Sequence, residues 1–211
     1  MLLGEMYGAP YDLLASRLGV NETRLRGIIA RWHKAGYADS NRMGSGPSWA
    51  WLTSAGMDLV GYSWEAGPPK VARLAHIRAV LASRLWMESS PQWEHSITVW
   101  RNERELRAGG PNQDRRAHVA DAEVWWPATA AASEETWAVE VELTPKGATK
   151  TAEVIAGLLT GQKYTRVMYL CGPSTFTLVQ GTAARFPADQ AKRLHVQPLP
   201  ANALYTGGGA S

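Results

Sequence analysis

Three carboxylates are the residues of this sequence best suited to chemistry. Asp121, Glu140 and Glu142 lie in two segments, 118–126 and 137–145, in which apolar and polar residues alternate. Such alternation is typical of half-buried strands, and the residues between the segments suit a hairpin connection. Carboxylates held together on one side of a sheet repel one another unless a cation neutralises them. Because Mg²⁺ and Mn²⁺ prefer oxygen ligands, the pattern predicts a metal site formed by these three residues.

Hydrolysis of a phosphodiester is a reaction that such a site could perform. Asp121 and Glu140 would hold the ion, which polarises a phosphoryl oxygen and lowers the pKa of a bound water. Glu142 would accept the proton or bind a second ion, and Lys146 or Arg116 would stabilise the negative charge that develops. Alternating glutamates also occur on solvated strand faces, where they only improve solubility. The carboxylates therefore leave a structural role open beside the catalytic one.

Two helices are expected near the N-terminus. The first covers residues 11–18 and ends at Gly19, which suits a helix C-cap. Asn21 is a good N-cap for a second helix that continues to about residue 35. Apolar residues of the second helix recur at helical spacing on one face, and the opposite face is small and basic.

A hairpin and a short helix follow these two helices. Strands are expected over residues 37–43 and 48–52, joined by a turn at residues 44–47, and Thr53 suits the N-cap of a helix over residues 53–60. The turn and cap motifs Leu18-Gly-Val, Gly36-Tyr and Leu52-Thr-Ser-Ala-Gly lie at the junctions of these elements.

Over roughly residues 2–62, this arrangement resembles winged helix-turn-helix DNA-binding domains. The resemblance implies that the basic face of the second helix contacts duplex DNA. The residues expected to contact DNA are Thr23, Arg24, Arg26, Arg31, Lys34, Arg42, Arg115 and Arg116. Winged helices also serve as protein–protein modules, so an adaptor function is an alternative.

The rest of the chain predicts an α/β domain. Pro68 and Pro69 interrupt the chain after the winged helix, so we expect domains at residues 1–64 and 70–205 and a flexible tail at 206–211. Further elements are expected as helices over 70–88, 149–159 and 173–186, strands over 96–100, 166–171 and 194–199, and a charged loop over 101–116. This order indicates an α/β fold, or α+β overall, with a mixed central sheet.

An Asp on one strand, Glu-x-Glu on the next and a following helix resemble the PD-(D/E)xK nuclease superfamily. The resemblance implies that Asp121 and Glu140 bind Mg²⁺. The third position is Glu142 where lysine is usual, and the residue before Asp121 is alanine where proline is usual. Lys146 could supply a relocated cation, and Glu105 could be the additional upstream acid of some members.

Nearly the full chain also resembles the replication-relaxation family of plasmids and integrative elements. The matching parts are the winged helix, Glu-Arg-Glu-Leu at residues 103–106, the two acidic strands and the pair Lys163-Tyr164. The family implies a DNA-binding role in replication, transfer or maintenance of a mobile element, with Lys163 as an auxiliary residue of the site.

Composition narrows the cellular context. The 211 residues, 45% of them hydrophobic, suffice for two packed domains. A single cysteine, Cys171, excludes an internal disulfide framework and a multi-cysteine zinc site. No apolar run approaches the ~18 residues of a membrane span, and the start does not resemble a signal peptide. We therefore expect a cytoplasmic protein without a membrane partner.

Three functions follow from these observations. The chain is a DNA-binding protein of a mobile element, a Mg²⁺-dependent DNA endonuclease, or a winged-helix adaptor between proteins. Duplex DNA is the expected partner and a homodimer is allowed, while a metal cofactor is expected only with catalysis. No nucleotide-binding loop or serine-hydrolase elbow is present. His118 is expected on the face of its strand opposite to Asp121, since it lies three positions before Asp121.

Overall fold

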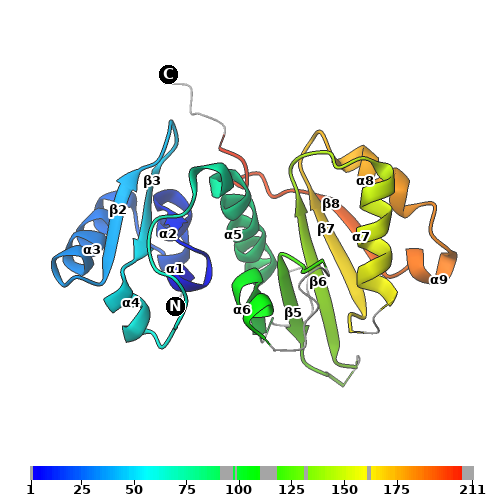
Figure 1. Ribbon diagram of the computed structural model, residues 1–211, viewed down its shortest axis with the longest axis horizontal. Helices are drawn as coiled ribbons and strands as arrows, with labels where there is room; N and C mark the ends of the chain where they lie inside the picture. The colour runs from blue at the N-terminus through cyan, green and yellow to red at the C-terminus, as the bar shows by residue number, and fades with distance from the viewer. Residues whose placement is uncertain are drawn as a thin grey trace. The chain divides into compact units, whose positions relative to one another are not determined.

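The chain folds into two compact units, which are mixed α/β overall. The computed structural model describes residues 2–90, 97, 99–109, 118–130, 133–160 and 163–205. The first unit comprises residues 1–85 and 201–211, and the second unit comprises residues 86–200 (Figure 1). The segment between residues 64 and 70, where the sequence suggests a domain boundary, lies within the first unit. No helix in the described part of the chain is both long and apolar enough to cross a membrane.

The first unit combines helices with a small antiparallel sheet. Its elements are α1 (Leu2–Glu5), β1 (Ala9–Pro10), α2 (Tyr11–Leu18), α3 (Glu22–Lys34), β2 (Ala38–Arg42), β3 (Ser48–Leu52), α4 (Ser54–Leu59), the 3-10 turn η1 (Val71–Arg73) and α5 (Leu74–Ser89), of which the part up to Leu85 belongs to this unit. The sheet has the strand order β1-β3-β2, and β2 and β3 form the expected hairpin. The sequence did not predict β1, because two residues are too few to show a period.

Local signals position α3. Gly19 ends α2 with a φ of 63°, in the left-handed region that glycine tolerates best. The side chain of Asn21 then accepts a hydrogen bond of 2.9 Å from the backbone N–H of Arg24 and caps α3. Leu25 and Ile29 are buried on the inner side of α3. The opposite side of the helix is consequently held outward.

The junction between β3 and α4 requires a close backbone approach. Thr53 caps α4, because its hydroxyl accepts a hydrogen bond of 3.2 Å from the N–H of Gly56. A Cβ atom on Gly56 would lie 1.9 Å from the carbonyl oxygen of Tyr37, so only glycine fits at this position. These contacts join the end of the hairpin to the chain that enters it.

The second unit is built around one mixed sheet. Its elements are β4 (Val99–Asn102), α6 (Glu103–Ala108), β5 (Ala122–Trp126), β6 (Glu135–Glu142), α7 (Ala148–Thr160), β7 (Arg166–Cys171), α8 (Phe176–Ala183), α9 (Ala188–Ala191) and β8 (Leu194–Pro198), together with the end of α5. The strand order is β4-β5-β6-β7-β8. β4, β5 and β6 pair antiparallel, while β6, β7 and β8 pair parallel. The predicted α/β class and mixed sheet are confirmed.

Helices cover one face of this sheet. Side chains of α7 and α8 pack on alternate residues of β6, β7 and β8, and α7 and α8 lie along that face in Figure 1. In the register of the sheet, Glu140 lies beside Tyr169 and Glu142 beside Cys171. Because adjacent residues in a ladder point to the same side, both glutamates project from the helix-covered face.

Several predicted bounds are wrong, most clearly between residues 101 and 121. The predicted charged loop contains α6, which begins after Asn102, whose side chain accepts a 3.1 Å hydrogen bond from the N–H of Glu105. Asn followed three residues later by Glu is an N-terminal capping pattern that could have revealed the helix. The strand expected from His118 begins only at Ala122, so Asp121 directly precedes β5.

Candidate functional site

The outer face of α3 is the candidate DNA-binding surface in the first unit. All of the predicted contact residues in this helix are exposed, namely Thr23, Arg24, Arg26, Arg31 and Lys34. Gly27 and Ala30 are exposed between them, so small side chains lie among the basic ones on this surface. This combination of small residues and cations suits a close approach to a phosphate backbone.

Most of the cations on this face are available to a partner. Arg26 forms an exposed ion pair of 3.2 Å with Glu22, one turn earlier in α3. Arg24, Arg31 and Lys34 form no ion pair with the described part of the chain. Exposed cations of this kind can neutralise phosphates and release the counterions condensed on DNA.

Three further residues are predicted to contact DNA, and the structure describes one of them. Arg42 is exposed at the end of β2, next to the turn of the β2–β3 hairpin. Arg115 and Arg116 lie outside the described residues. The structure therefore places a basic residue on the hairpin as well as on α3.

In the second unit, the predicted acidic residues are brought to one region of the sheet. Glu140 and Glu142 are buried on the helix-covered face, with 3% and 6% of their surfaces exposed. Asp121 lies just beyond the β5–β6 ladder, and its side chain accepts a 2.8 Å hydrogen bond from the N–H of Val141. The carboxylates are close enough that the charge of Asp121 raises the pKa of Glu140.

Glu140 and Glu142 each lie against a different basic side chain of the second unit. Nε2 of His118 lies 2.8 Å from Oε1 of Glu140. Nζ of Lys146 lies 2.9 Å from Oε2 of Glu142. Lys146, which the sequence marks as a candidate relocated cation, thus forms an ion pair with Glu142.

The burial of Glu140 decides its protonation. Burial and then the nearby charge of Asp121 raise its pKa to about 7, although the hydrogen bond and charge of His118 and the charge of Lys146 oppose the rise. The pKa of His118 is raised in turn, chiefly by its hydrogen bond to Glu140. Near neutral pH, the buried carboxyl group of Glu140 and the partly exposed imidazole of His118 therefore titrate as a coupled pair.

The contact of His118 with Glu140 corrects one expectation from the sequence. Residues 118–121 are not part of a strand, so the alternation that placed His118 opposite to Asp121 does not apply. His118 instead reaches the face that carries Glu140. No spacing motif in the sequence marks this pair, because the contact depends on how the chain enters β5.

The fit of a divalent metal rests on Asp121 and Glu140. Among the described residues, no three His, Cys, Asp or Glu side chains are placed to hold a metal ion together. The two carboxylates suit Mg²⁺, which commonly binds one or two carboxylates together with water. Tyr169, beside Glu140 in the sheet, has a buried hydroxyl without a hydrogen-bond partner in the described structure, and it could donate to an oxygen of such a ligand.

The predicted auxiliary residues Lys163 and Glu105 belong to one ion-pair network around Glu123, an acid that the sequence did not indicate as part of a site. Nζ of Lys163 lies 2.7 Å from Oε2 of Glu123, whose Oε1 is 3.1 Å from Nη1 of Arg101. Glu105 binds the same Arg101 at 3.1 Å. Lys163 and Glu105 are therefore linked through Glu123 and Arg101, and their contacts with these residues are separate from those of the acidic trio.

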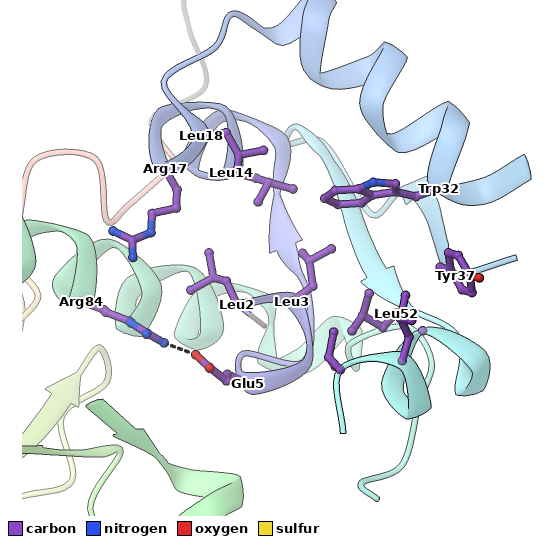
Figure 2. A pocket seen from close by; sticks show the side chains of 13 residues that line it. Leu2, Leu3, Glu5, Leu14, Arg17, Leu18, Trp32, Tyr37, Leu52 and Arg84 are labelled. Carbon is purple, nitrogen blue, oxygen red and sulfur yellow. Dashed lines mark hydrogen bonds and ion pairs between the residues drawn. The ribbon is translucent and has the colours of Figure 1, made fainter. Parts of the chain in front are cut away.

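An apolar cavity of about 560 Å³ lies elsewhere in the first unit, and Figure 2 shows its lining. Leucines of α1 and α2 line it together with Trp32 of α3. Leu18, Tyr37 and Leu59, which also line it, are among the most exposed large apolar residues. Glu5 and Arg84 form a buried ion pair at its edge.

No family model, curated protein or solved structure matches this chain.

Proposed function

We propose that the protein binds duplex DNA through the outer face of α3. The observation that carries this proposal is the group of three exposed cations, Arg24, Arg31 and Lys34, without ion-pair partners in the described structure. They surround the small residues Gly27 and Ala30, which allow the helix to approach the floor of a groove. Phosphates would supply the missing counter-charges.

The order of elements in the first unit supports this proposal. Two helices joined by a tight turn precede a hairpin that pairs with a short N-terminal strand. This order is that expected of a winged helix-turn-helix, with α3 as the recognition helix and the β2–β3 turn as the wing. We further propose, on the resemblance to the replication-relaxation family, that the DNA-binding function serves replication, transfer or maintenance of a mobile element.

Replacement of two cations of α3 tests the DNA-binding function. Arg31→Ala with Lys34→Ala should weaken binding to a fluorescein-labelled duplex and reduce the slope of log K against log salt by about 2. The control is Lys150→Ala with Lys192→Ala, which removes the same charge from the second unit. Equal binding by wild type and the α3 variant, in anisotropy titrations across salt concentrations, would overturn the assignment.

Mg²⁺-dependent cleavage of DNA is a second candidate function. It is favoured by Asp121, Glu140 and Lys146 near one region of the helix-covered face, and by the unpartnered hydroxyl of Tyr169 beside them. When bound, Mg²⁺ polarises a phosphoryl oxygen and lowers the pKa of a bound water. Asp121 and Glu140 would hold the ion, and the ammonium group of Lys146 would stabilise negative charge on the phosphate.

Glu142 departs from the lysine usual at the third position of such sites. Its carboxylate is bound to Lys146, so it holds this cation in place near the other two acids. Near neutral pH, the contact between His118 and Glu140 can hold a proton at Nε2 of the imidazole. Lys146 thus supplies a positive charge and His118 a proton carrier, whereas the lysine usual at the third position is absent.

Calorimetry separates the nuclease from the DNA-binding function. Mn²⁺ titrated into wild type should release heat at a site that is lost in Asp121→Ala, whereas Lys150→Ala should bind like wild type. Absence of Mn²⁺ binding by wild type would dispose of the nuclease and leave the DNA-binding proposal unaffected. A labelled duplex incubated with Mn²⁺ then shows whether a bound ion leads to cleavage.

The adaptor function would use another part of the first unit. The apolar cavity with Leu18, Tyr37 and Leu59 at its surface is the kind of exposed patch that marks a protein partner. DNA affinity that is absent at low salt would favour this function over the proposed one.

A further inference from the structure

The segment 201–205 is a fixed part of the first unit. The methyl group of Ala203 is fully buried, and Nη2 of Arg78 donates a hydrogen bond of 2.9 Å to the carbonyl oxygen of Asn202. The guanidinium of the same Arg78 lies 5.8 Å from the ring centre of Tyr205. The segment is drawn in red beside α5 in Figure 1. Its release would expose an apolar group and remove an acceptor from a buried arginine, so the segment stays seated.

This segment brings Tyr205 to a hollow of about 320 Å³ beside α3 and the β2–β3 hairpin. Arg26 from the first half of α3 and Arg42 from β2 line the same hollow. The ring of Tyr205 lies against the hairpin turn at Gly46, where a Cβ atom would be 3.8 Å from the ring. Tyr205 is nevertheless 48% exposed, so its outer side is available to a partner.

The acids in the hollow are already neutralised. Asp12 accepts hydrogen bonds of 2.9 and 2.6 Å from Arg78, and Glu22 pairs with Arg26 at 3.2 Å. Arg42 forms no ion pair with the described residues. The hollow therefore offers one available guanidinium beside a tyrosine, which suits a nucleotide. The guanidinium binds the phosphate, and the tyrosine supplies a hydroxyl donor and a flat ring.

We propose that Tyr205 contacts DNA, so that the C-terminal segment completes the surface formed by α3 and the hairpin. The inference rests on the DNA-binding function proposed above. Because the segment stays seated, a duplex that reaches Arg42 and the hairpin turn meets the exposed side of Tyr205. The phenolic hydroxyl donates a hydrogen bond to a phosphate oxygen next to the one that Arg42 binds.

Two substitutions at one position test this contact in the full chain. Tyr205→Ala should lower the affinity for a fluorescein-labelled duplex about three- to tenfold, since a hydrogen bond and a ring contact are lost. Tyr205→Glu should lower it further, by more than about tenfold, because a carboxylate repels the phosphate. The controls Tyr37→Ala and Tyr37→Glu change a tyrosine of similar exposure, 39%, that lines the apolar cavity instead. They should bind within about twofold of wild type.

The salt dependence distinguishes Tyr205 from its cationic neighbour. Tyr205→Ala removes no charge, so it should lower affinity while the slope of log K against log salt stays that of wild type. Arg42→Ala should instead reduce the slope by about 1. Circular dichroism melting of each variant verifies that the fold is retained.

Each outcome decides between the two proposals. If Arg31→Ala with Lys34→Ala weakens binding but Tyr205→Ala and Tyr205→Glu bind like wild type, the inference about Tyr205 is overturned and the DNA-binding function stands. Tighter binding by Tyr205→Ala would also overturn it, because the segment would then obstruct DNA. If wild type binds no duplex, both proposals fail.

Discussion

The two units treat their charged residues in opposite ways. On α3, Arg24, Arg31 and Lys34 are exposed and unmatched within the described structure. On the sheet of the second unit, Glu140 and Glu142 are buried, and each lies against an internal partner. An exposed cation needs no internal partner, whereas a buried carboxylate without one would cost several kcal/mol.

Exposed cations and buried acids differ in what they indicate about function. A surface of exposed, unmatched cations is solvated in the free protein, and it can bind anions without breaking an internal contact. A buried acid that already has a donor or cation is explained by the fold itself, and a ligand must compete with that partner. The basic face of α3 is therefore the stronger functional evidence, although the acidic trio is the more conspicuous feature of the sequence.

The largest expected effect concerns the pH dependence of the acidic contact. Glu140 and His118 both have raised pKa values in the folded protein, compared with ordinary values of 4.5 and 6.5. The folded state therefore binds more protons than the unfolded state, and the stability gained is lost as the pH rises through the folded pKa values. Between pH 5 and 8, the rise of the Glu140 pKa to about 7 should lower the free energy of unfolding by on the order of 2 kcal/mol, and the partly exposed His118 should add little to this change.

Glu140→Gln should largely remove this pH dependence. Glutamine keeps a hydrogen-bond acceptor for His118 but cannot ionise, so the variant should unfold with a flatter profile and exceed wild type in stability at pH 8. Urea unfolding followed by tryptophan fluorescence at several pH values measures both. A wild-type profile that rises from pH 5 to 8 would contradict the raised pKa values of Glu140 and His118.

Next in size is the effect of a negative charge placed on α3. Ala30→Glu should weaken duplex binding at least tenfold, which corresponds to about 1.4 kcal/mol. Ala184→Glu makes the same change at an exposed position after α8 and should bind within about twofold of wild type. Anisotropy titrations of both variants compare the two units directly. Equal losses would show that net charge, rather than the face of α3, governs affinity.

A smaller effect is expected when the cation that pairs with the buried Glu142 is removed. Lys146→Met leaves Glu142 buried without its ion pair, so the free energy of unfolding should fall by about 1 kcal/mol, allowing for the partial exposure of the lysine. Lys150→Met removes an exposed ion pair with Glu153 and should cost only a few tenths of a kcal/mol. Urea unfolding of the two variants measures the contrast, and equal costs would mean that burial of Glu142 is unimportant.

Features with local causes were predictable from the sequence. Gly19, Asn21 and Thr53 mark the ends of α2, α3 and α4, because turns and caps depend on neighbouring residues alone. The alternation of β6 also located Glu140 and Glu142 on one face. The expectation of exposed cations on α3 followed from helical spacing in the same way.

Features with distant causes were not predictable. The contact between His118 and Glu140 depends on the path of the chain before β5, where no periodic pattern applies. The joint binding of Arg101 and Lys163 by Glu123 depends on the register of β4, β5 and β6 and on a residue that follows α7. A single sequence contains no signal for register of this kind, since alternation fixes the face of a residue but not its neighbour.

Photocrosslinking shows whether the outer face of α3 contacts DNA. A photoreactive benzoylphenylalanine at Thr23, the second residue of α3, is compared with one at Thr149, the second residue of α7, which is also exposed. Neither substitution changes the charge of the protein. On irradiation with a duplex, DNA adducts are expected from position 23 and not from position 149. Adducts from position 149 with none from position 23 would contradict DNA binding by α3.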